Sequence, residues 1–405
     1  MMLQQFFENN ADLSSVVKST YQILCVPNIT RQSNLNQDSY VLVMENVIKE
    51  LNRIRDDLFF HIPITEFCPR LDFHNTKQYI FKMPSFPNAM RSHYDFYQWN
   101  EVLNAKNIEM DVIWSHLPEQ TTNIKNHCHN IYSQDIPVIG YSHWIENKEF
   151  APNWKTTFYH NNITGMLQMD KCGLNTQTQI DAILDEAREH YSQKTIDKLS
   201  DIMIPLYLGI EPNKVSKSVK TDTDKVIVFN HRTKEYRGWK NFIKIIQELR
   251  KQRQDFKVFC SMIDPAGQAL VKNSFDDTSF FDYDGPSDRD EYIAKLTNCR
   301  VGFHGGTRWA MSSQDGLCRG IPYVFEKGSE TGELFGDRMQ TGFSKNSEAI
   351  NLFNRMLDDD EYRNVQSQLA LDHCSNVHTW ENRIKPFNDI ISQAIQKQSS
   401  DIIQS

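Results

Sequence analysis

Residues 302–335 read GFHGGTRWAMSSQDGLCRGIPYVFEKGSETGELF, and this segment decides the predicted fold. The run at residues 300–304 predicts a buried strand, and a Gly-Gly turn follows it. A helix predicted to start near Ser312 carries Asp315, and the apolar run IPYVF predicts a second strand. The pieces form a βαβ unit, in which ligands lie at the carboxyl ends of the strands and glycines let backbone N–H groups approach a phosphate. The alternative is an ordinary βαβ crossover.

Residues 315–322, Asp-Gly-Leu-Cys-Arg-Gly-Ile-Pro, resemble the Glu-Ala-Met-Ala-x-Gly-x-Pro segment of GT-B glycosyltransferases. In that family the acidic residue binds the nucleotide ribose, so the resemblance implies this role for Asp315. Eight positions earlier, where the retaining families carry another Glu, this chain has Thr307. We expect Gly305, Gly306 and Thr307 to form the turn of the donor site.

A second cluster, VIVFNHRTKEYRGWKNF at residues 226–242, combines a buried strand with cations at its carboxyl end. A helix begins near Gly238, and its N-terminus can face an anion. In GT-B enzymes an Arg and a Lys here clamp the donor diphosphate. Arg232 matches the Arg, and either Arg237 or Lys240 stands where the Lys would be. Two such cations would stabilise the leaving diphosphate without a metal, whereas the alternative is a solvated basic helix start.

The third cluster follows the strand IPYVF and reads Glu-Lys-Gly-Ser-Glu-Thr-Gly-Glu at residues 326–333. Its glycines free the backbone to wrap a phosphate, and a carboxylate can accept hydrogen bonds from sugar hydroxyls. Thr331, Gly332 and Glu333 resemble the Thr-Gly-Glu loop of the phage DNA α-glucosyltransferases that modify hydroxymethylcytosine. These residues, with Tyr283 at the end of another predicted strand, complete the predicted donor site.

The N-terminal half is expected to hold the acceptor and any general base. The strand IPVIGYSH ends in His143, which matches a catalytic His of GT-B enzymes, and Glu146 is the nearest carboxylate after it. A histidine suits proton transfer near neutral pH, although a structural role at a strand end is the alternative. His116 ends the preceding predicted strand and could line the same site.

Strand and helix patterns predict two Rossmann-like α/β domains, and the resemblance to GT-B enzymes implies a cleft between them. In the first half, the predicted strands are residues 21–27, 79–83, 111–116, 137–143 and 165–169, and the predicted helices include 41–55 and 180–199. In the second half, the predicted strands are 226–229, 256–260, 280–283, 301–304 and 323–325. The predicted domains are residues 1–212, which bind the acceptor, and 213–380, which bind the nucleotide sugar. Residues 378–383, His-Thr-Trp-Glu-Asn-Arg, resemble a family signature, and they imply that residues 381–405 form a helix packing back on the first domain.

Composition limits the classes of protein to which the chain can belong. Its 405 residues and 39% hydrophobic content allow two cores, and its net charge of −8 argues against a protein that coats nucleic acid. No secretory signal and no apolar run of about 18 residues is recognised, so we expect a soluble cytoplasmic protein, in the host cytoplasm if it is viral. The eight cysteines show no CxxC pair, and no metal site is predicted. Residues 225–257 carry ten Lys or Arg against three acidic residues, and this basic stretch could face DNA, a diphosphate or solvent.

These features predict a glycosyltransferase that moves a hexose or pentose from a nucleoside-diphosphate sugar, expected to be UDP-linked, to a hydroxyl acceptor. No tightly bound cofactor, no strictly required metal and no membrane partner is expected. The leading acceptor is double-stranded phage DNA with hydroxymethylated bases. A glycan or protein acceptor is the alternative within the enzyme class, and a non-catalytic binding protein of the same fold is the alternative outside it.

Overall fold

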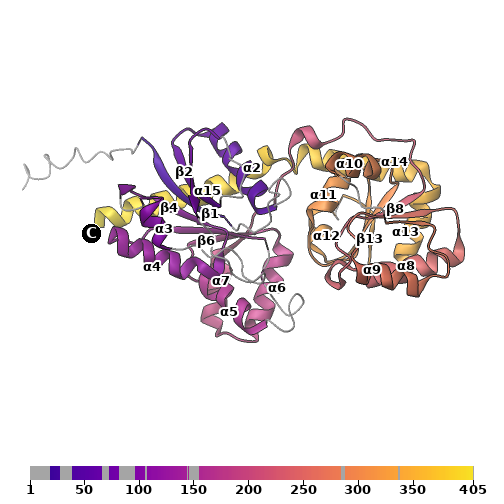
Figure 1. Ribbon diagram of the computed structural model, residues 1–405, viewed down its shortest axis with the longest axis horizontal. Coiled ribbons are helices and arrows are strands. Elements are labelled where there is room, and N and C mark those ends of the chain that lie inside the picture. Colours follow the sequence, from indigo (N-terminus) through magenta and orange to yellow (C-terminus); the bar gives the residue numbers. More distant parts are fainter. Residues whose placement is uncertain are drawn as a thin grey trace, which may run out of the picture.

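The computed structural model describes residues 19–27, 39–65, 73–81, 96–104, 107–143, 145, 155–283, 288–335 and 338–404. Two parallel β-sheets, each with helices on its faces, form two α/β domains that lie side by side (Figure 1). Parallel strands covered on both faces read as continuous apolar runs, and most strands of this chain do so. Within the described residues, no helix combines the length and apolar character needed to cross a membrane.

The N-terminal domain is built on a seven-stranded sheet with the order β3-β2-β1-β4-β5-β6-β7. Neighbouring strands are all parallel. Its strands are β1 Tyr21–Val26, β2 Leu58–Thr65, β3 Thr76–Phe81, β4 Val112–Ser115, β5 Val138–Ser142, β6 Lys171–Leu174 and β7 Met203–Pro205. Its helices are α2 Ser39–Ile54, α3 Phe96–Glu101, η3 Pro118–Gln120, α4 Thr121–Tyr132, α5 Lys155–Met166, α6 Gln177–Arg188 and α7 Gln193–Ile202.

The C-terminal domain is built on a six-stranded parallel sheet with the order β10-β9-β8-β11-β12-β13. Its strands are β8 Val226–Phe229, β9 Lys257–Cys260, β10 Phe281–Asp282, β11 Val301–His304, β12 Tyr323–Glu326 and β13 Gly342–Phe343. Its helices are η5 Glu235–Arg237, α8 Trp239–Gln252, α9 Pro265–Ser274, α10 Arg289–Thr297, α11 Met311–Leu317, α12 Glu330–Phe335, α13 Asn346–Asp358 and α14 Asp360–Asn376. On α8, Phe242, Ile245, Ile246 and Leu249 are buried.

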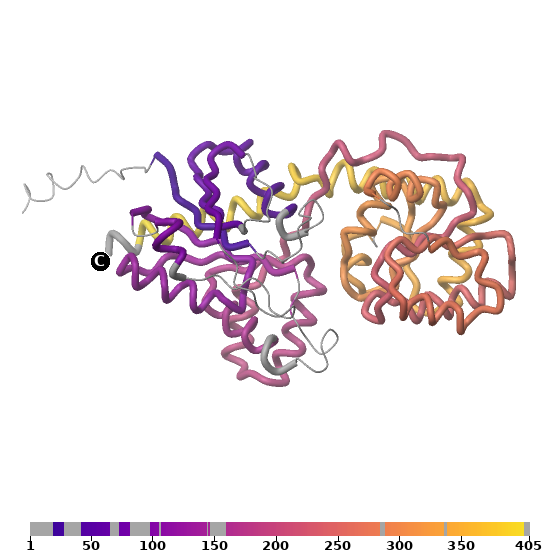
Figure 2. The backbone as a smooth tube through the Cα atoms, viewed as in Figure 1, coloured from indigo at the N-terminus to yellow at the C-terminus, as the bar shows by residue number. Residues whose placement is uncertain are grey.

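Two segments cross between the domains side by side. The chain first crosses between β7 and β8, through η4 Pro212–Lys214, and it returns at the start of α15 Trp380–Gln404. Ile210 pairs with Thr379 in an isolated parallel bridge, and its N–H donates to the His378 carbonyl at 2.7 Å. Helix α15 then runs back along the N-terminal domain and packs on α2, β4 and β5 (Figure 2). The predicted boundary at Pro212 lies in the first of these crossings.

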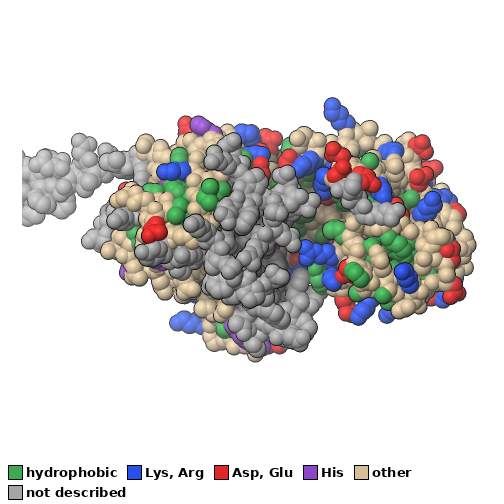
Figure 3. Space-filling model, viewed as in Figure 1, with side chains coloured by type: hydrophobic (Ala, Val, Ile, Leu, Met, Phe, Trp, Pro, Cys, Tyr) green, Lys and Arg blue, Asp and Glu red, His purple; other side chains and the backbone are tan. Residues whose placement is uncertain are grey.

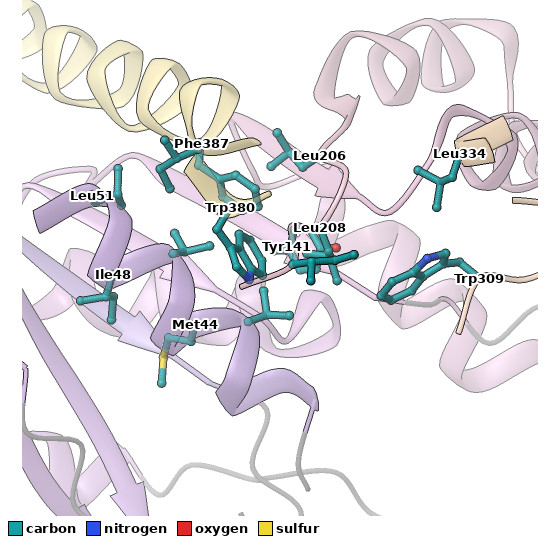
Figure 4. Close-up of a cluster of buried hydrophobic side chains, with 14 of the residues drawn as sticks. Met44, Ile48, Leu51, Tyr141, Leu206, Leu208, Trp309, Leu334, Trp380 and Phe387 are labelled. Carbon is teal, nitrogen blue, oxygen red and sulfur yellow. The ribbon is translucent and has the colours of Figure 1, made fainter. Parts of the chain in front are cut away.

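One hydrophobic cluster continues through the crossings from one domain to the other. It includes Tyr141 of β5, Leu208 of the first crossing, and Trp380 at the start of α15. From the C-terminal domain, Trp309 and Leu334 belong to the same cluster, and Figure 4 shows them beside the crossing segment. The two sheets are therefore joined by buried apolar contacts as well as by the chain.

Several predicted elements differ from the structure. The strand predicted at residues 165–169 is wrong, because this run ends α5 and the strand follows at Lys171–Leu174. Gly165 lies so close to η3 that a Cβ there would overlap the backbone carbonyl of Pro118, and this explains the glycine. The helical region predicted at residues 180–199 is two helices, α6 and α7, and Ser192 caps the second by accepting from Thr195 N–H.

Candidate active site

The topology brings the predicted donor residues of the C-terminal domain to the ends of β8 and β11. These strands are neighbours although they are not consecutive, so the strand order reverses between them, and such a switch point is where α/β sheets bind ligands. Asn230 and His231 follow β8 and are buried, while Arg232 follows them and is exposed. The turn predicted at Gly305 and Gly306 follows β11 directly.

A buried polar network supports this end of the sheet. Asn230 Nδ2 donates to the Ser312 carbonyl at 2.6 Å and to the Tyr292 hydroxyl at 3.0 Å. The Tyr323 hydroxyl donates to Asn230 Oδ1 at 3.0 Å. Satisfied buried networks of this kind stabilise one arrangement of the groups that they join. Asn230 thus ties β8 to α10, to the start of α11 and to β12.

Two buried histidines, which sequence reasoning assigned no role, hold the turn after β11. His231 Nε2 lies 3.2 Å from His304 Nδ1, and the opposite ring nitrogens lie 2.7 Å from the Ser312 hydroxyl and 2.8 Å from the Arg308 carbonyl. Burial, helped by the charge of Arg237, lowers the pKa of His304 to about 3. Both rings are therefore neutral at physiological pH, and they act as hydrogen-bonding spacers. Their position at strand ends was the signal available in the sequence.

Arg237 lies against the same turn. Its Nη1 donates to the carbonyl oxygens of Arg308 and Trp309, each at 2.9 Å. Burial lowers the pKa of Arg237, and the nearby charge of Arg232 acts in the same direction. A guanidinium keeps its charge despite such a shift, so two cations stand near each other at this edge of the sheet.

The glycines at this site allow two loops to approach closely. Gly238 has φ of +74°, and a Cβ there would lie 2.5 Å from the Gly305 carbonyl oxygen. A Cβ on Gly306 would lie 2.5 Å from the Tyr236 carbonyl oxygen. Both distances are shorter than real Cβ contacts, so the loop after β8 and the turn after β11 can pack only without side chains at these positions. Phosphate binding by Gly305 and Gly306 stays a prediction.

Asp315 and Lys240 have ionic partners in this structure. Asp315 lies on α11 as predicted, and its carboxylate pairs with both terminal nitrogens of Arg289, at 2.9 and 2.5 Å. Lys240 Nζ lies 2.7 Å from Glu235 Oε2, and both side chains are exposed. A ribose bound to Asp315 would therefore share the carboxylate with Arg289. Arg237 rather than Lys240 contacts the turn after β11.

The other predicted donor residues lie on three separate segments. Thr331 is buried on α12, and Gly332 N–H donates to the Ser329 hydroxyl at 3.1 Å. Thr307 is exposed, and its carbonyl accepts from Glu330 N–H at 2.8 Å. Tyr283 stacks on Phe281 with ring centroids 5.5 Å apart, and burial raises the pKa of its hydroxyl to about 12. Both oxygens of Glu333 contact the N-terminal domain or the first crossing.

Glu330 is a buried carboxyl of this site that sequence reasoning missed. Its side chain is 2% exposed, and Oε2 has no hydrogen-bond partner among the described residues. Burial raises the pKa of Glu330 to about 7, although Arg308 and Arg237 act in the opposite direction. The Trp309 backbone and the Thr176 side chain also act to lower the pKa of this carboxyl. It therefore titrates near physiological pH.

This shift predicts a pH-dependent stability. The folded-state pKa of Glu330 lies above its ordinary value of 4.5, so the folded protein holds the proton more tightly than the unfolded chain does. The stabilisation is complete below pH 4.5 and is lost as the pH rises through about 7; it amounts to about 3 kcal/mol. Glu330→Gln is expected to remove it. Chemical denaturation at pH 5 and pH 8 tests this, and an identical pH dependence in the wild type and the variant would contradict it.

The facing domain presents two histidines at the ends of neighbouring strands. His143 follows β5, and its ring centroid lies 6.3 Å from that of His116, which follows β4. The His143 carbonyl accepts from Asn175 Nδ2 at 2.7 Å and from Gln179 Nε2 at 2.9 Å. Neither ring nitrogen of His116 has a hydrogen-bond partner among the described residues, and burial lowers its pKa to about 3. Glu146 lies outside the described residues.

The basic stretch at residues 225–257 is largely neutralised in the structure. At least six of its ten cations have acidic partners, and these are Lys225, Lys234, Lys240, Arg250, Lys251 and Arg253. On the face shown in Figure 3, basic and acidic side chains alternate over the C-terminal domain. No continuous basic surface is therefore seen on this face to attract a polyanion.

The sequence predicts no metal site, and its cysteines show no CxxC pair. Within the described ranges, no group of three or more His, Cys, Asp or Glu side chains is arranged to hold a metal ion. All seven described cysteines are free thiols and buried. That glycosyl transfer by this protein requires no metal stays a prediction.

Comparison with solved structures identifies the fold. The chain is similar to sucrose-phosphate synthase of Thermosynechococcus elongatus, with a TM-score of 0.66, 11% identity, and coverage of 93% of this chain and 100% of that one. It is also similar to Anabaena HepE in complex with UDP and glucose, with a TM-score of 0.63, 12% identity, and coverage of 92% and 100%. A third similar structure is a UDP-forming trehalose-phosphate synthase from Burkholderia xenovorans, with a TM-score of 0.62, 12% identity, and coverage of 94% and 99%. No protein-family profile and no curated protein matches the sequence.

These similarities extend over nearly the whole chain and confirm the predicted fold class. The protein has the GT-B fold, with two parallel-sheet α/β domains and a last helix that returns to the first domain. At 11 to 12% identity the similarity concerns the fold and does not by itself assign an activity.

Proposed function

We propose that the protein is a glycosyltransferase that moves a sugar from a UDP-linked donor to a hydroxyl group. The observation that carries the proposal is the pair of cations, Arg232 and Arg237, at the switch point of the C-terminal sheet. Similarity to HepE, whose structure holds UDP and glucose, and to a UDP-forming synthase supports this choice of donor. Asp315 is the proposed ribose ligand.

The proposed transfer depends on stabilising the charge of the leaving diphosphate. When the bond between sugar and diphosphate breaks, negative charge grows on the leaving diphosphate, and cations held at that point stabilise the transition state. Arg237 is held by two backbone carbonyls, while Arg232 is exposed and free to approach a bound diphosphate. His143, from the facing domain, is the proposed contact to a sugar or acceptor hydroxyl.

The first test is donor turnover. Purified protein is offered a panel of nucleotide sugars, and nucleoside diphosphate release is measured with and without acceptors. We expect release from a UDP-sugar, and Arg232→Ala is expected to raise the donor KM about tenfold, because one charge-assisted contact is lost. Lys251→Ala is the matched control, since Lys251 is an exposed cation on α8 that pairs with Glu248. Release from no nucleotide sugar would instead favour a binding protein.

The acceptor proposal is tested separately. Double-stranded DNA with hydroxymethylated bases remains the proposed acceptor, on the strength of the short motif at residues 331–333. Most cations of residues 225–257 pair with acidic side chains, so this basic stretch supports a DNA acceptor less than the sequence alone does. Labelled sugar is therefore offered to hydroxymethylated DNA, to unmodified DNA and to glycans. Transfer to a glycan but to neither DNA would reject the DNA acceptor and leave the proposed transferase activity standing. The cytoplasmic location is proposed together with the DNA acceptor.

A further inference from the structure

The two domains meet where α12 of the C-terminal domain contacts the start of α6 (Figure 1). Glu333 of α12 makes this contact with both carboxylate oxygens. Oε1 accepts from Gln177 N–H at 2.9 Å and from the Tyr207 hydroxyl at 2.5 Å, and Oε2 accepts from Thr178 N–H at 2.6 Å. A single side chain thus joins the C-terminal domain to α6 and to the first crossing.

The partners of Glu333 suit a carboxylate. The first N–H groups of a helix lack acceptors within the helix and carry partial positive charge, so a negative charge beside them is favourable. Burial acts to raise the pKa of Glu333, but hydrogen bonds from Tyr207, Thr178 and Gln177 outweigh it and lower the pKa below its ordinary value. The side chain is therefore ionised at neutral pH, and its hydrogen bonds are charge-assisted.

A second carboxyl of α12 reaches the same helix end. Glu330 lies three residues before Glu333, and residues at this spacing share one face of a helix. Its carboxyl lies near the Thr176 side chain, which acts to lower the pKa of Glu330, and Thr176 is the N-cap residue of α6. Glu333 therefore holds residues 177 and 178, and Glu330 of the same helix lies near residue 176.

The start of α6 is in turn tied to the proposed catalytic histidine. Asn175, which precedes the N-cap, and Gln179 of the first turn both donate to the His143 carbonyl. A chain of contacts thus runs from α12, which follows a strand of the donor-bearing sheet, through the start of α6 to His143. Movement of α12 relative to α6 would change the distance between the cation pair and His143.

We propose that Glu333 is a positioning residue that clasps the two domains, and that it acts through α6 rather than as a ligand of the donor sugar. Its two oxygens are already occupied in the structure by groups of the N-terminal domain and of the crossing. The catalytic consequence rests on the proposed transferase function, whereas the clasp itself does not. When the clasp is removed, the domains are expected to open, and donor binding must then restore the closed state.

The test combines shape and kinetics in the full-length chain. We expect Glu333→Ala to increase the radius of gyration in small-angle scattering. Its donor KM should rise about tenfold, which is about 1.4 kcal/mol, with kcat within about twofold of wild type, because only the closed fraction is lowered. Tyr207→Phe removes one hydroxyl and should give a smaller shift in the same direction, and Glu333→Gln should restore part of the loss. Glu248→Ala, on the exposed face of α8, is the matched control.

Two results would overturn the clasp. One is an unchanged radius of gyration in both Glu333→Ala and Tyr207→Phe. The other is a loss of kcat at unchanged donor KM with a wild-type scattering curve, which is expected if Glu333 contacts the reacting sugar. If even the wild type turns over no donor, the scattering result still decides the clasp, so the two proposals fail separately. A cooperative thermal unfolding transition confirms that each variant is folded. If Glu333→Ala is not folded, Tyr207→Phe tests the clasp in its place.

Discussion

Gly238→Ala is expected to lower the free energy of unfolding by about 4 kcal/mol. The left-handed backbone, with φ of +74°, costs an alanine about 1 kcal/mol or more. The new Cβ also overlaps the Gly305 backbone, and overpacking of this kind adds roughly 1–3 kcal/mol. Because backbone is rigid on both sides, the loops after β8 and β11 must separate, and this would also displace Arg237.

Gly328→Ala is the matched control for this prediction. Gly328 has φ of +78°, almost the same as Gly238, but no atom lies within 4 Å of its added Cβ. Only the backbone term remains, so the expected loss is about 1 kcal/mol. Chemical denaturation of both variants, followed by tryptophan fluorescence, measures the difference. Equal losses would show that the close approach of Gly238 and Gly305 contributes nothing.

Arg237→Ala is expected to lower kcat/KM for the donor about 100-fold, the size typical of losing a preorganised group that stabilises transition-state charge. It should also cost about 3 kcal/mol of stability, because the carbonyls of Arg308 and Trp309 lose a charged donor in a partly buried place. Turnover and chemical denaturation measure the two effects. Arg232→Ala, which removes an exposed side chain, should reduce turnover without the loss of stability.

Lys240→Ala separates Arg237 from the other candidate for the same role. Lys240 is exposed and pairs with Glu235, so its loss is expected to change donor turnover by no more than a few-fold. A large loss of turnover in Lys240→Ala, together with a small one in Arg237→Ala, would assign the diphosphate contact to Lys240 and contradict the role given to Arg237.

The strands that frame the donor site could be predicted from the sequence because each is a short apolar run ended by polar residues or glycine. Val226–Phe229 and Val301–His304 have the predicted bounds. By contrast, β2 was not predicted, because His61 and Pro63 interrupt the run Leu58–Thr65. His61 is buried, and its ring nitrogens lie 2.8 Å from the Tyr79 hydroxyl and the Gln22 side-chain oxygen, which satisfy its polar atoms. These partners lie on other strands, so a local sequence pattern does not reveal them.

The contacts that complete the candidate site are too distant in sequence to be predicted. Glu333 and Gln177 are 156 residues apart, and their contact joins the two domains. Local reasoning placed Glu333 in a loop with suitable chemistry, but its partners depend on how the domains meet. Asp315 was placed correctly on its helix, whereas its pairing with Arg289 from α10 depends on tertiary packing.

Locating the UDP-binding site tests the proposed donor site most directly. Hydrogen–deuterium exchange of the full-length protein is measured with and without UDP at saturating concentration. Slower exchange is predicted for residues 230–238, which follow β8, and for residues 304–310, which follow β11, since backbone groups contacted by a ligand open less often. Protection confined to the N-terminal domain, or no protection at millimolar UDP, would contradict a nucleotide-sugar site at the switch point of the C-terminal sheet.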